Sequence, residues 1–442
     1  MQTISLTTKP VPKLFFQYLI PSICGTMVTS IYVLADTIIV GKGIGITAMA
    51  ALNIILPIFS LLFGTGLLFG IGGSVLMSIS RGRGDIAMGE RYFTVAFFLN
   101  LFFSVLYTLL FFFFMKPFAR FLGGTDVTLP YIMNYLPWII GGTLIFSFST
   151  FLQAFIRNDG APKLSMAAVV TGGIINVVLD IFFVFPCHMG MAGAAIASVI
   201  GSFFTDCILF SHFLSKKNGL HFRIKGISAS HFHHIFANGF TSFLIEMSSG
   251  IVMFVFNLQI LKYVGNIGVS LYGVITNTAI VVSCLSNGIS QAAQPIISTN
   301  YGAGHSTRIT QVKKLGLKTA LFVCSVPTIL GLVAPNAFTY VFLHPTKEIL
   351  ALSSSAIRIY FIAFVVTGIN MFIINYFQAT ARSGYSLLLC LLRGCVLSVL
   401  FVNILPPLLG VTGIWMSVPL AEFISLLLGV FLLKKDTLHT SL

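Results

Sequence analysis

The sequence has few charged residues. Only 8% of its 442 residues are Asp, Glu, Lys or Arg, whereas an ordinary soluble domain carries about 25%. So little charge cannot cover a surface that faces water. The 57% of hydrophobic residues and the 44 phenylalanines suit a surface that faces lipid. We therefore expect the lipid bilayer to be the solvent of most of this chain.

Sequence motifs of several other protein classes are also missing. There is no GxxxxGK[ST] phosphate loop, which argues against an ATPase, and no HExxH zinc motif. The seven cysteines include no CxxC pair, and we interpret them as free thiols rather than a disulfide frame or zinc site. The net charge of +14 is scattered over short loops, unlike the clustered basic face of a nucleic-acid-binding protein. We expect no enzyme, no cofactor and no nucleic-acid partner.

Long apolar runs fill most of the chain. A membrane-spanning helix needs about 20 apolar residues, and the first run is too long for a cleavable signal. The sequence therefore predicts an all-α polytopic membrane protein with twelve spans. They are expected at 14–40, 48–79, 93–115, 130–156, 164–186, 191–214, 236–261, 268–299, 316–343, 351–380, 385–409 and 411–433.

The basic residues predict the orientation of these spans. If the N-terminus is inside, eighteen Lys and Arg residues fall in the inner segments and six in the outer ones. Lys and Arg are enriched in cytoplasmic loops. We therefore expect both termini in the cytoplasm, with the protein in the plasma (inner) membrane.

Short motifs recur about 220 residues apart. Those at 81–85, 152–154 and 190–193 are followed by similar ones at 301–305, 377–379 and 410–413. We interpret the chain as two pseudo-symmetric six-helix lobes, 1–214 and 236–442, joined by a basic cytoplasmic linker, 215–235. Two lobes related by an axis along the membrane normal are a transporter architecture.

Acidic residues within apolar runs are candidates for function, since a carboxylate at the bilayer centre costs roughly 2.5–3.5 kcal/mol. Asp36, Asp180 and Ser198 are expected at similar depth, roughly 6–10 Å below the outer surface. Asn176 lies one turn from Asp180 on the same helix face. These four residues predict an ion-coupling site for Na⁺, bound at Asp36, Asn176 and Asp180, or for a proton shared by the two acids. The alternative is a hydrogen-bonded network that only joins three helices.

Further ionisable side chains within predicted spans are Glu246, Arg393, Glu422 and Asp206. Glu246 is expected about 15 Å deep and has no obvious basic partner, so we predict that it binds substrate or a proton in a central cavity. Its alternative is a packing role. Arg393 and Glu422 are expected to form an ion pair of structural importance. Asp206 is expected near the inner interface and receives no role.

Two further features leave alternatives open. Pro21 removes a backbone donor within the first span, and we interpret it as either a hinge or a plain bend. His231, His233 and His234 could bind a metal, but a loop at the level of the lipid headgroups is the stronger interpretation.

Several motifs together resemble the multidrug and toxic compound extrusion (MATE) family, in its prokaryotic branch. The segments 32–41, 176–180 with 190–197, and 294–304 resemble its signatures in helices 1, 5–6 and 8. The resemblance covers the whole chain and implies twelve helices in two V-shaped lobes. It implies antiport of cationic or amphipathic compounds against H⁺ or Na⁺.

The resemblance also implies residue roles. Asp36, Asn176 and Asp180 match the family's ion-coupling residues, and Ser198 stands where some members have threonine. Pro21 matches a proline whose bending has been linked to protonation, and Glu246 falls where other members carry a coupling acid. Both acidic sites are present, so the coupling lobe and the coupling ion stay open.

We therefore predict a secondary active exporter of small organic cations that works as a monomer. A lipid-linked precursor flippase of the same superfamily is the first alternative. It would need a basic cavity for pyrophosphate, and Arg393 is the one base assigned to the interior of a span, because Lys318 and Arg358 are counted with the inner and outer segments. A membrane-embedded transferase is the second. It would need acids or histidines at a helix end, whereas the acids here lie deep within spans.

Overall fold

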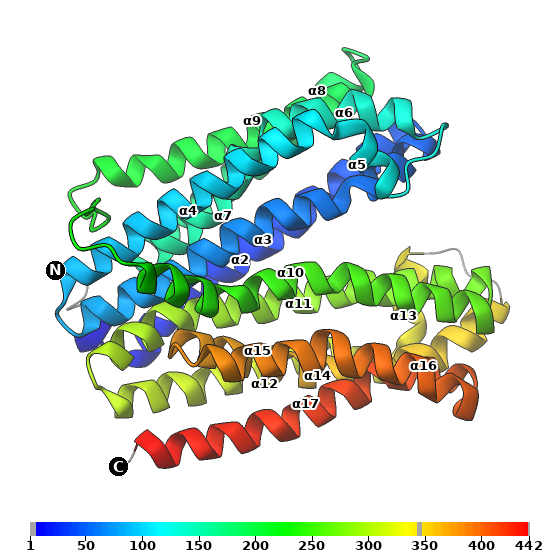
Figure 1. The fold of residues 1–442 in the computed structure, drawn as a ribbon. Coiled ribbons are helices and arrows are strands. Elements are labelled where there is room, and N and C mark those ends of the chain that lie inside the picture. The colour runs from blue at the N-terminus through cyan, green and yellow to red at the C-terminus, as the bar shows by residue number, and fades with distance from the viewer. Residues whose placement is uncertain (1–5, 343–346, 441–442) are drawn as a thin grey trace. The chain divides into compact units, whose positions relative to one another are not determined.

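The computed structural model describes residues 6–342 and 347–440, and this part of the chain contains helices and no strand (Figure 1). In the first half the helices are α2 (Val11–Gly43), α3 (Ile46–Gly82), α4 (Ile86–Phe113), α5 (Met115–Phe121), α6 (Leu129–Gly141), α7 (Thr143–Asn158), α8 (Pro162–Val184), α9 (Gly190–Phe210) and the 3₁₀ turn η1 (Ser211–Leu214). In the second half they are α10 (Ala229–Tyr263), α11 (Asn266–Gly302), α12 (Ser306–Val333), α13 (Pro335–Phe342), α14 (Lys347–Ala379), α15 (Ser383–Leu391), the π-helical turn η2 (Leu392–Val396), α16 (Leu397–Leu409) and α17 (Val411–Thr440).

The predicted all-α fold with multiple spans is confirmed, with eleven or twelve spans. Eleven helices in the described chain are long and apolar enough to cross a membrane. The bent pair α6 and α7, with 54° between its members, makes a twelfth when counted as one span. Helix α10 begins at Ala229, so the last seven residues of the segment interpreted as the linker are helical.

Local sequence explains where several helices begin and end. Asp85 caps α4, because its side chain accepts a hydrogen bond from the backbone N–H of Met88 at 2.9 Å. The predicted ninth span, 316–343, differs from the structure, in which α12 starts ten residues earlier and ends at Val333. Pro335 causes the break, since a proline disfavours the α conformation of the residue before it.

The chain forms two compact units. One contains residues 1–9, 20–247 and 298–304, and the other contains residues 10–19, 248–297 and 305–442. Helices α2, α10 and α11 each contribute to both units. Glu246 lies in the second half of the sequence, yet it belongs to the same unit as Asp36.

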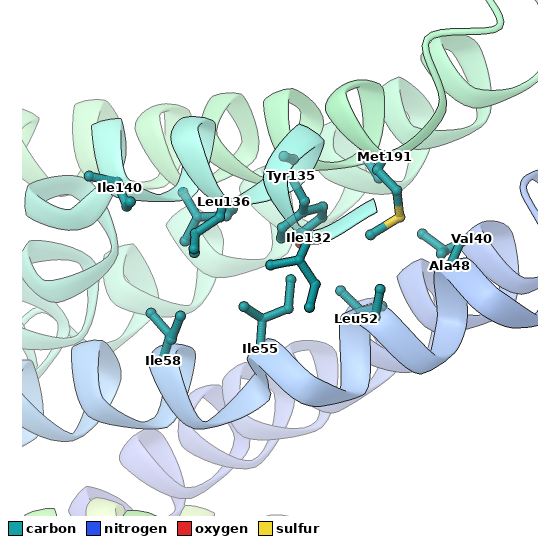
Figure 2. Close-up of a cluster of buried hydrophobic side chains, with 14 of the residues drawn as sticks. Val40, Ala48, Leu52, Ile55, Ile58, Ile132, Tyr135, Leu136, Ile140 and Met191 are labelled. Carbon is teal, nitrogen blue, oxygen red and sulfur yellow. The ribbon is translucent and has the colours of Figure 1, made fainter. Parts of the chain in front are cut away.

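A large apolar cluster lies at one end of the first unit. Figure 2 shows Leu52 and Ile55 of α3 facing Ile132 and Tyr135 of α6, with Met191 of α9 beside them. These five side chains are almost completely buried. Since burial of apolar side chains favours close packing, this cluster fixes α6 and α9 against α3 next to the candidate site.

The second unit has its own core. Phe256 of α10 stacks on Tyr272 of α11, with ring centroids 5.6 Å apart. Phe361 and Phe364 of α14 pack at 4.4 Å in the same cluster. Aromatic pairs at such distances stabilise packing beyond the area that they bury.

Candidate functional site

Close packing of α8 on α9 positions the amide of the candidate site. A Cβ atom on Gly201 would lie 2.7 Å from both the Cβ of Asn176 and the carbonyl oxygen of Gly172. Only glycine leaves room for this approach. One turn earlier on α9, the Ser198 hydroxyl accepts a hydrogen bond from Asn176 Nδ2 at 3.2 Å.

Asp36 and Asp180 complete the predicted site. Asp180 follows Asn176 by one turn of α8 and is fully buried, and Asp36 of α2 is 9% exposed. The two carboxyl groups adjoin, so that one proton between them would complete a hydrogen bond. The structure therefore brings together all four residues that the sequence assigned to this site.

Protein donors do not satisfy the oxygen atoms of the site. In the described part of the chain, no hydrogen-bond donor reaches Asp36 Oδ1, Asn176 Oδ1 or either carboxylate oxygen of Asp180. A buried polar atom without a partner costs about 1–3 kcal/mol. A proton would remove part of this cost, and a small cation would remove more because it accepts several oxygen ligands at once. The residues present thus fit either coupling ion.

Two tyrosines belong to the site and were not predicted from the sequence. Tyr135 of α6 is fully buried, and its hydroxyl lies beside Asp36, Asp180 and Ser198. Tyr32 precedes Asp36 by one turn of α2 and lies near Glu246 as well. The spacing of Tyr32 from Asp36 was the available signal, whereas no sequence spacing points to Tyr135.

Glu246 lies in α10, where this helix packs on α3. A Cβ atom on Gly64 of α3 would lie 3.6 Å from the Cβ of Glu246. Tyr32 lies near both Glu246, the predicted substrate-binding residue, and Asp36 of the predicted ion site.

Pro21 lies within α2, which is continuous from Val11 to Gly43. The division between the two compact units falls at Leu19 and Ile20, directly before this proline. A proline lacks the N–H that would bond to the preceding turn, so α2 lacks one backbone hydrogen bond next to this division.

Arg393 and Glu422 lie together in the second unit. Arg393 Nε donates to Glu422 Oε1 at 2.6 Å. Thr367 donates to the same oxygen at 2.9 Å, and Asn370 donates to Oε2 at 2.7 Å. Arg393 lies in the π-helical turn η2, which connects α15 to α16. Both oxygens of the carboxylate are satisfied, in contrast to those of Asp180.

The remaining sequence candidates lie apart from the site. Asp206 is 6% exposed and accepts a hydrogen bond from Ser149 at 2.6 Å. His231 interacts with Ser228 at 2.8 Å, and His234 lies 3.3 Å from the Tyr92 hydroxyl. Over residues 6–342 and 347–440, no group of three or more His, Cys, Asp or Glu residues is arranged to hold a metal.

The fold and the site define a multi-pass, all-α membrane protein with buried carboxyl groups inside its spans. A family model named MatE matches residues 21–182 and 240–404. The chain therefore belongs to the MatE family, which confirms the resemblance found in the sequence.

Similar proteins agree with this assignment along the whole chain. The multidrug export protein MepA of Staphylococcus haemolyticus is 24% identical over 423 residues, which cover 95% of this chain and 92% of that protein. MepA of Staphylococcus aureus (strain MSSA476) is 24% identical over 442 residues, with 98% and 96% covered.

Solved structures share the fold. An outward-facing multidrug resistance MATE family transporter of the MOP superfamily aligns with a TM-score of 0.92 and 21% identity, covering 100% of this chain and 99% of the other. A MOP superfamily transporter from Pyrococcus furiosus, described as having a binding pocket of reversed polarity, gives the same TM-score and identity.

Proposed function

We propose that the protein is a secondary active multidrug exporter, which moves cationic or amphipathic small molecules outward in exchange for H⁺ or Na⁺. The observation that carries the proposal is the Asp36–Asp180 pair. Three of its buried carboxylate oxygens receive no hydrogen bond from a described donor. An ionisable residue inside a membrane span marks an ion pathway or substrate site by default. The multidrug export named for the MepA relatives agrees with this role.

In this mechanism the ion enters from outside and binds between Asp36 and Asp180, with Asn176 and Ser198 as neutral oxygen donors. Ion binding neutralises the pair and favours the conformation in which substrate is released outward. Glu246 holds the positive charge of the substrate or a second proton, and Pro21 serves as the hinge of α2. Both termini are in the cytoplasm, no organic cofactor takes part and no bond of the substrate is broken, so the protein is a transporter and not an enzyme.

The driving force limits what such an exchange can do. One charge that moves through 100 mV releases about 2.3 kcal/mol, enough for roughly a fifty-fold gradient at 1.4 kcal/mol per decade. When one monovalent cation leaves for one H⁺ that enters, the voltage term cancels. Export is then driven by the concentration gradient of the ion alone.

Transport in liposomes tests the proposal. The purified protein would be reconstituted, and export of a fluorescent organic cation would be followed under an imposed H⁺ or Na⁺ gradient. The matched variants are Asp36→Asn and Asp126→Asn, because Asp126 is an exposed aspartate outside the spans. We expect gradient-driven transport in the wild type and in Asp126→Asn, and its loss in Asp36→Asn.

Other outcomes are informative in different ways. Transport that survives in Asp36→Asn would move the coupling role to Glu246. No transport with either ion would contradict drug export and would favour a flippase for lipid-linked precursors.

A further inference from the structure

The segment between η1 and α10, residues 215–228, lies against α4 beside its exposed phenylalanines. The ring of Phe222 contacts those of Phe93 and Phe97 at centroid distances of 5.1 and 5.0 Å, and that of Phe98 at 6.3 Å. Phe98 is 50% exposed. Since α4 is a candidate membrane span, its exposed phenylalanines face lipid, and the segment lies beside that lipid.

Polar contacts fix the segment to α4. The backbone N–H of Arg223 donates to Thr94 Oγ1 at 2.8 Å, and its guanidinium pairs with Glu90 at 3.1 Å. In return, Arg91 Nε donates to the backbone carbonyl of Lys225 at 3.1 Å. The segment therefore has a defined position on the helix.

A buried aspartate fixes the earlier part of the segment. Asp159 accepts hydrogen bonds from the backbone N–H of Gly219 at 2.9 Å and from Arg81 Nη1 at 2.6 Å, and His212 Nε2 lies 2.6 Å from its second oxygen. Both ends of the segment are thus held on the first unit. Its exposed side chains therefore have defined positions.

Large apolar side chains at the end of η1 and in this segment are exposed. Leu214 is 90% exposed, Ile224 is 72% exposed and Phe222 is 52% exposed. Isolated exposed apolar residues are ordinary, but several together mark a binding surface. Because α4 beside them also exposes Phe102, at 60%, the apolar residues continue toward the lipid-facing side of the span.

Positive charge accompanies these apolar residues. Lys216, Lys217 and Lys225 are exposed, and among the described residues none of them forms an ion pair with an acid. The chain has no Asp or Glu between positions 207 and 245. Basic clusters next to a membrane span attract anionic phospholipids, and apolar side chains among them enter the boundary of the acyl chains.

We propose that Leu214, Lys216, Lys217, Phe222, Ile224 and Lys225 form a binding surface for anionic phospholipids, called here the linker surface. The ammonium groups bind phosphates of lipid headgroups, and Leu214, Phe222 and Ile224 contact the upper parts of acyl chains. A basic residue near an anionic surface contributes on the order of a fivefold gain in affinity. The three lysines together would then contribute about a hundredfold.

Native mass spectrometry of the full chain in detergent tests this proposal with dioleoylphosphatidylglycerol and dioleoylphosphatidylcholine as probes. The triple variant Lys216→Gln, Lys217→Gln, Lys225→Gln should bind phosphatidylglycerol about a hundredfold more weakly, with phosphatidylcholine binding unchanged. The control triple Lys163→Gln, Lys314→Gln, Lys318→Gln removes the same charge from exposed lysines elsewhere. An equal loss in both triples would show general charge attraction and overturn the proposal.

A second variant separates a lipid from a soluble phosphate. Leu214→Ser with Ile224→Ser should weaken phosphatidylglycerol binding several-fold, and both side chains are exposed, so the thermal unfolding curve should not move. Glycerol phosphate in solution should not compete with the lipid. Unchanged lipid affinity in this variant, or competition by glycerol phosphate at the same concentration as the lipid, would contradict the proposal.

Discussion

The carboxyl groups of Asp36 and Asp180 adjoin inside one compact unit, although they come from helices far apart in the sequence. Neither Asp36 Oδ1 nor the two Asp180 oxygens receive a hydrogen bond from a described donor. Two acids that have no basic partner among the described residues form a poor structural link, since each carries a cost of burial. The same pair is well suited to hold an ion that comes and goes.

Replacement of either acid should remove coupling as completely as replacement of both. Asp36→Asn and Asp180→Asn each keep the side-chain volume and remove the shared negative charge. We expect each single variant and the double variant to lose ion-driven export to the same extent, because residues that act as one unit are not additive. Initial export rates in liposomes measure this. A double variant much worse than either single variant would show two independent sites.

The Tyr135 hydroxyl should affect the affinity for the coupling ion without being essential for ion binding. Tyr135→Phe removes one oxygen beside both acids and leaves the ring in the apolar cluster of Figure 2. We expect the ion concentration for half-maximal export to change several-fold, with little change in maximal rate. Tyr131→Phe, one turn earlier on α6, is the control and should behave as the wild type. Equal effects of the two variants would contradict a role at the site.

The Arg393–Glu422 pair should matter for stability. Glu422→Gln leaves a mostly buried guanidinium without its charge partner, and we expect a loss of about 3 kcal/mol in the free energy of unfolding. Thr367→Val removes one hydrogen bond to the same carboxylate and should cost about 1 kcal/mol. Thermal unfolding in detergent would rank the two variants. A Glu422→Gln variant as stable as the wild type, with export lost, would assign the pair to function instead.

Gly201 should be needed for the geometry of the ion site. Gly201→Ala places a Cβ atom 2.7 Å from Asn176 and from the Gly172 carbonyl oxygen, so α8 and α9 must move apart. We expect a cost of about 1–3 kcal/mol and a weaker response of export to the ion. Gly141→Ala is the matched control, because its Cβ atom would meet nothing within 4 Å. Unfolding and export assays on both variants decide the matter.

The spans and the proximity of the candidate site residues could be predicted from the sequence because both depend on distance along a helix. A rise of 1.5 Å per residue gives the length of each span, and it placed Asp36, Asp180 and Ser198 at one depth. Which residues face each other depends on the rotation of each helix about its axis. The depth of a residue does not give the rotation of its helix. For this reason Tyr135 could not be assigned to the site from the sequence.

Other features depend on tertiary contacts that the sequence does not show. The π-helical turn around Arg393 has no composition signal, since it arises from one extra residue within a helix. Asp159 was not singled out, yet it joins Arg81, His212 and the backbone of the linker. Such a network forms between segments that are separated by more than fifty residues.

The central claim is that Asp36 and Asp180 together bind the coupling ion, and ion binding to the purified protein tests it most directly. Isothermal titration calorimetry with Na⁺ at fixed pH, and proton uptake by a pH indicator after an acid pulse, would compare the wild type with the Asp36→Asn, Asp180→Asn double variant. The account predicts one bound ion, Na⁺ or H⁺, that is present in the wild type and absent in the double variant. Ion binding of equal affinity and stoichiometry in the two proteins would contradict it.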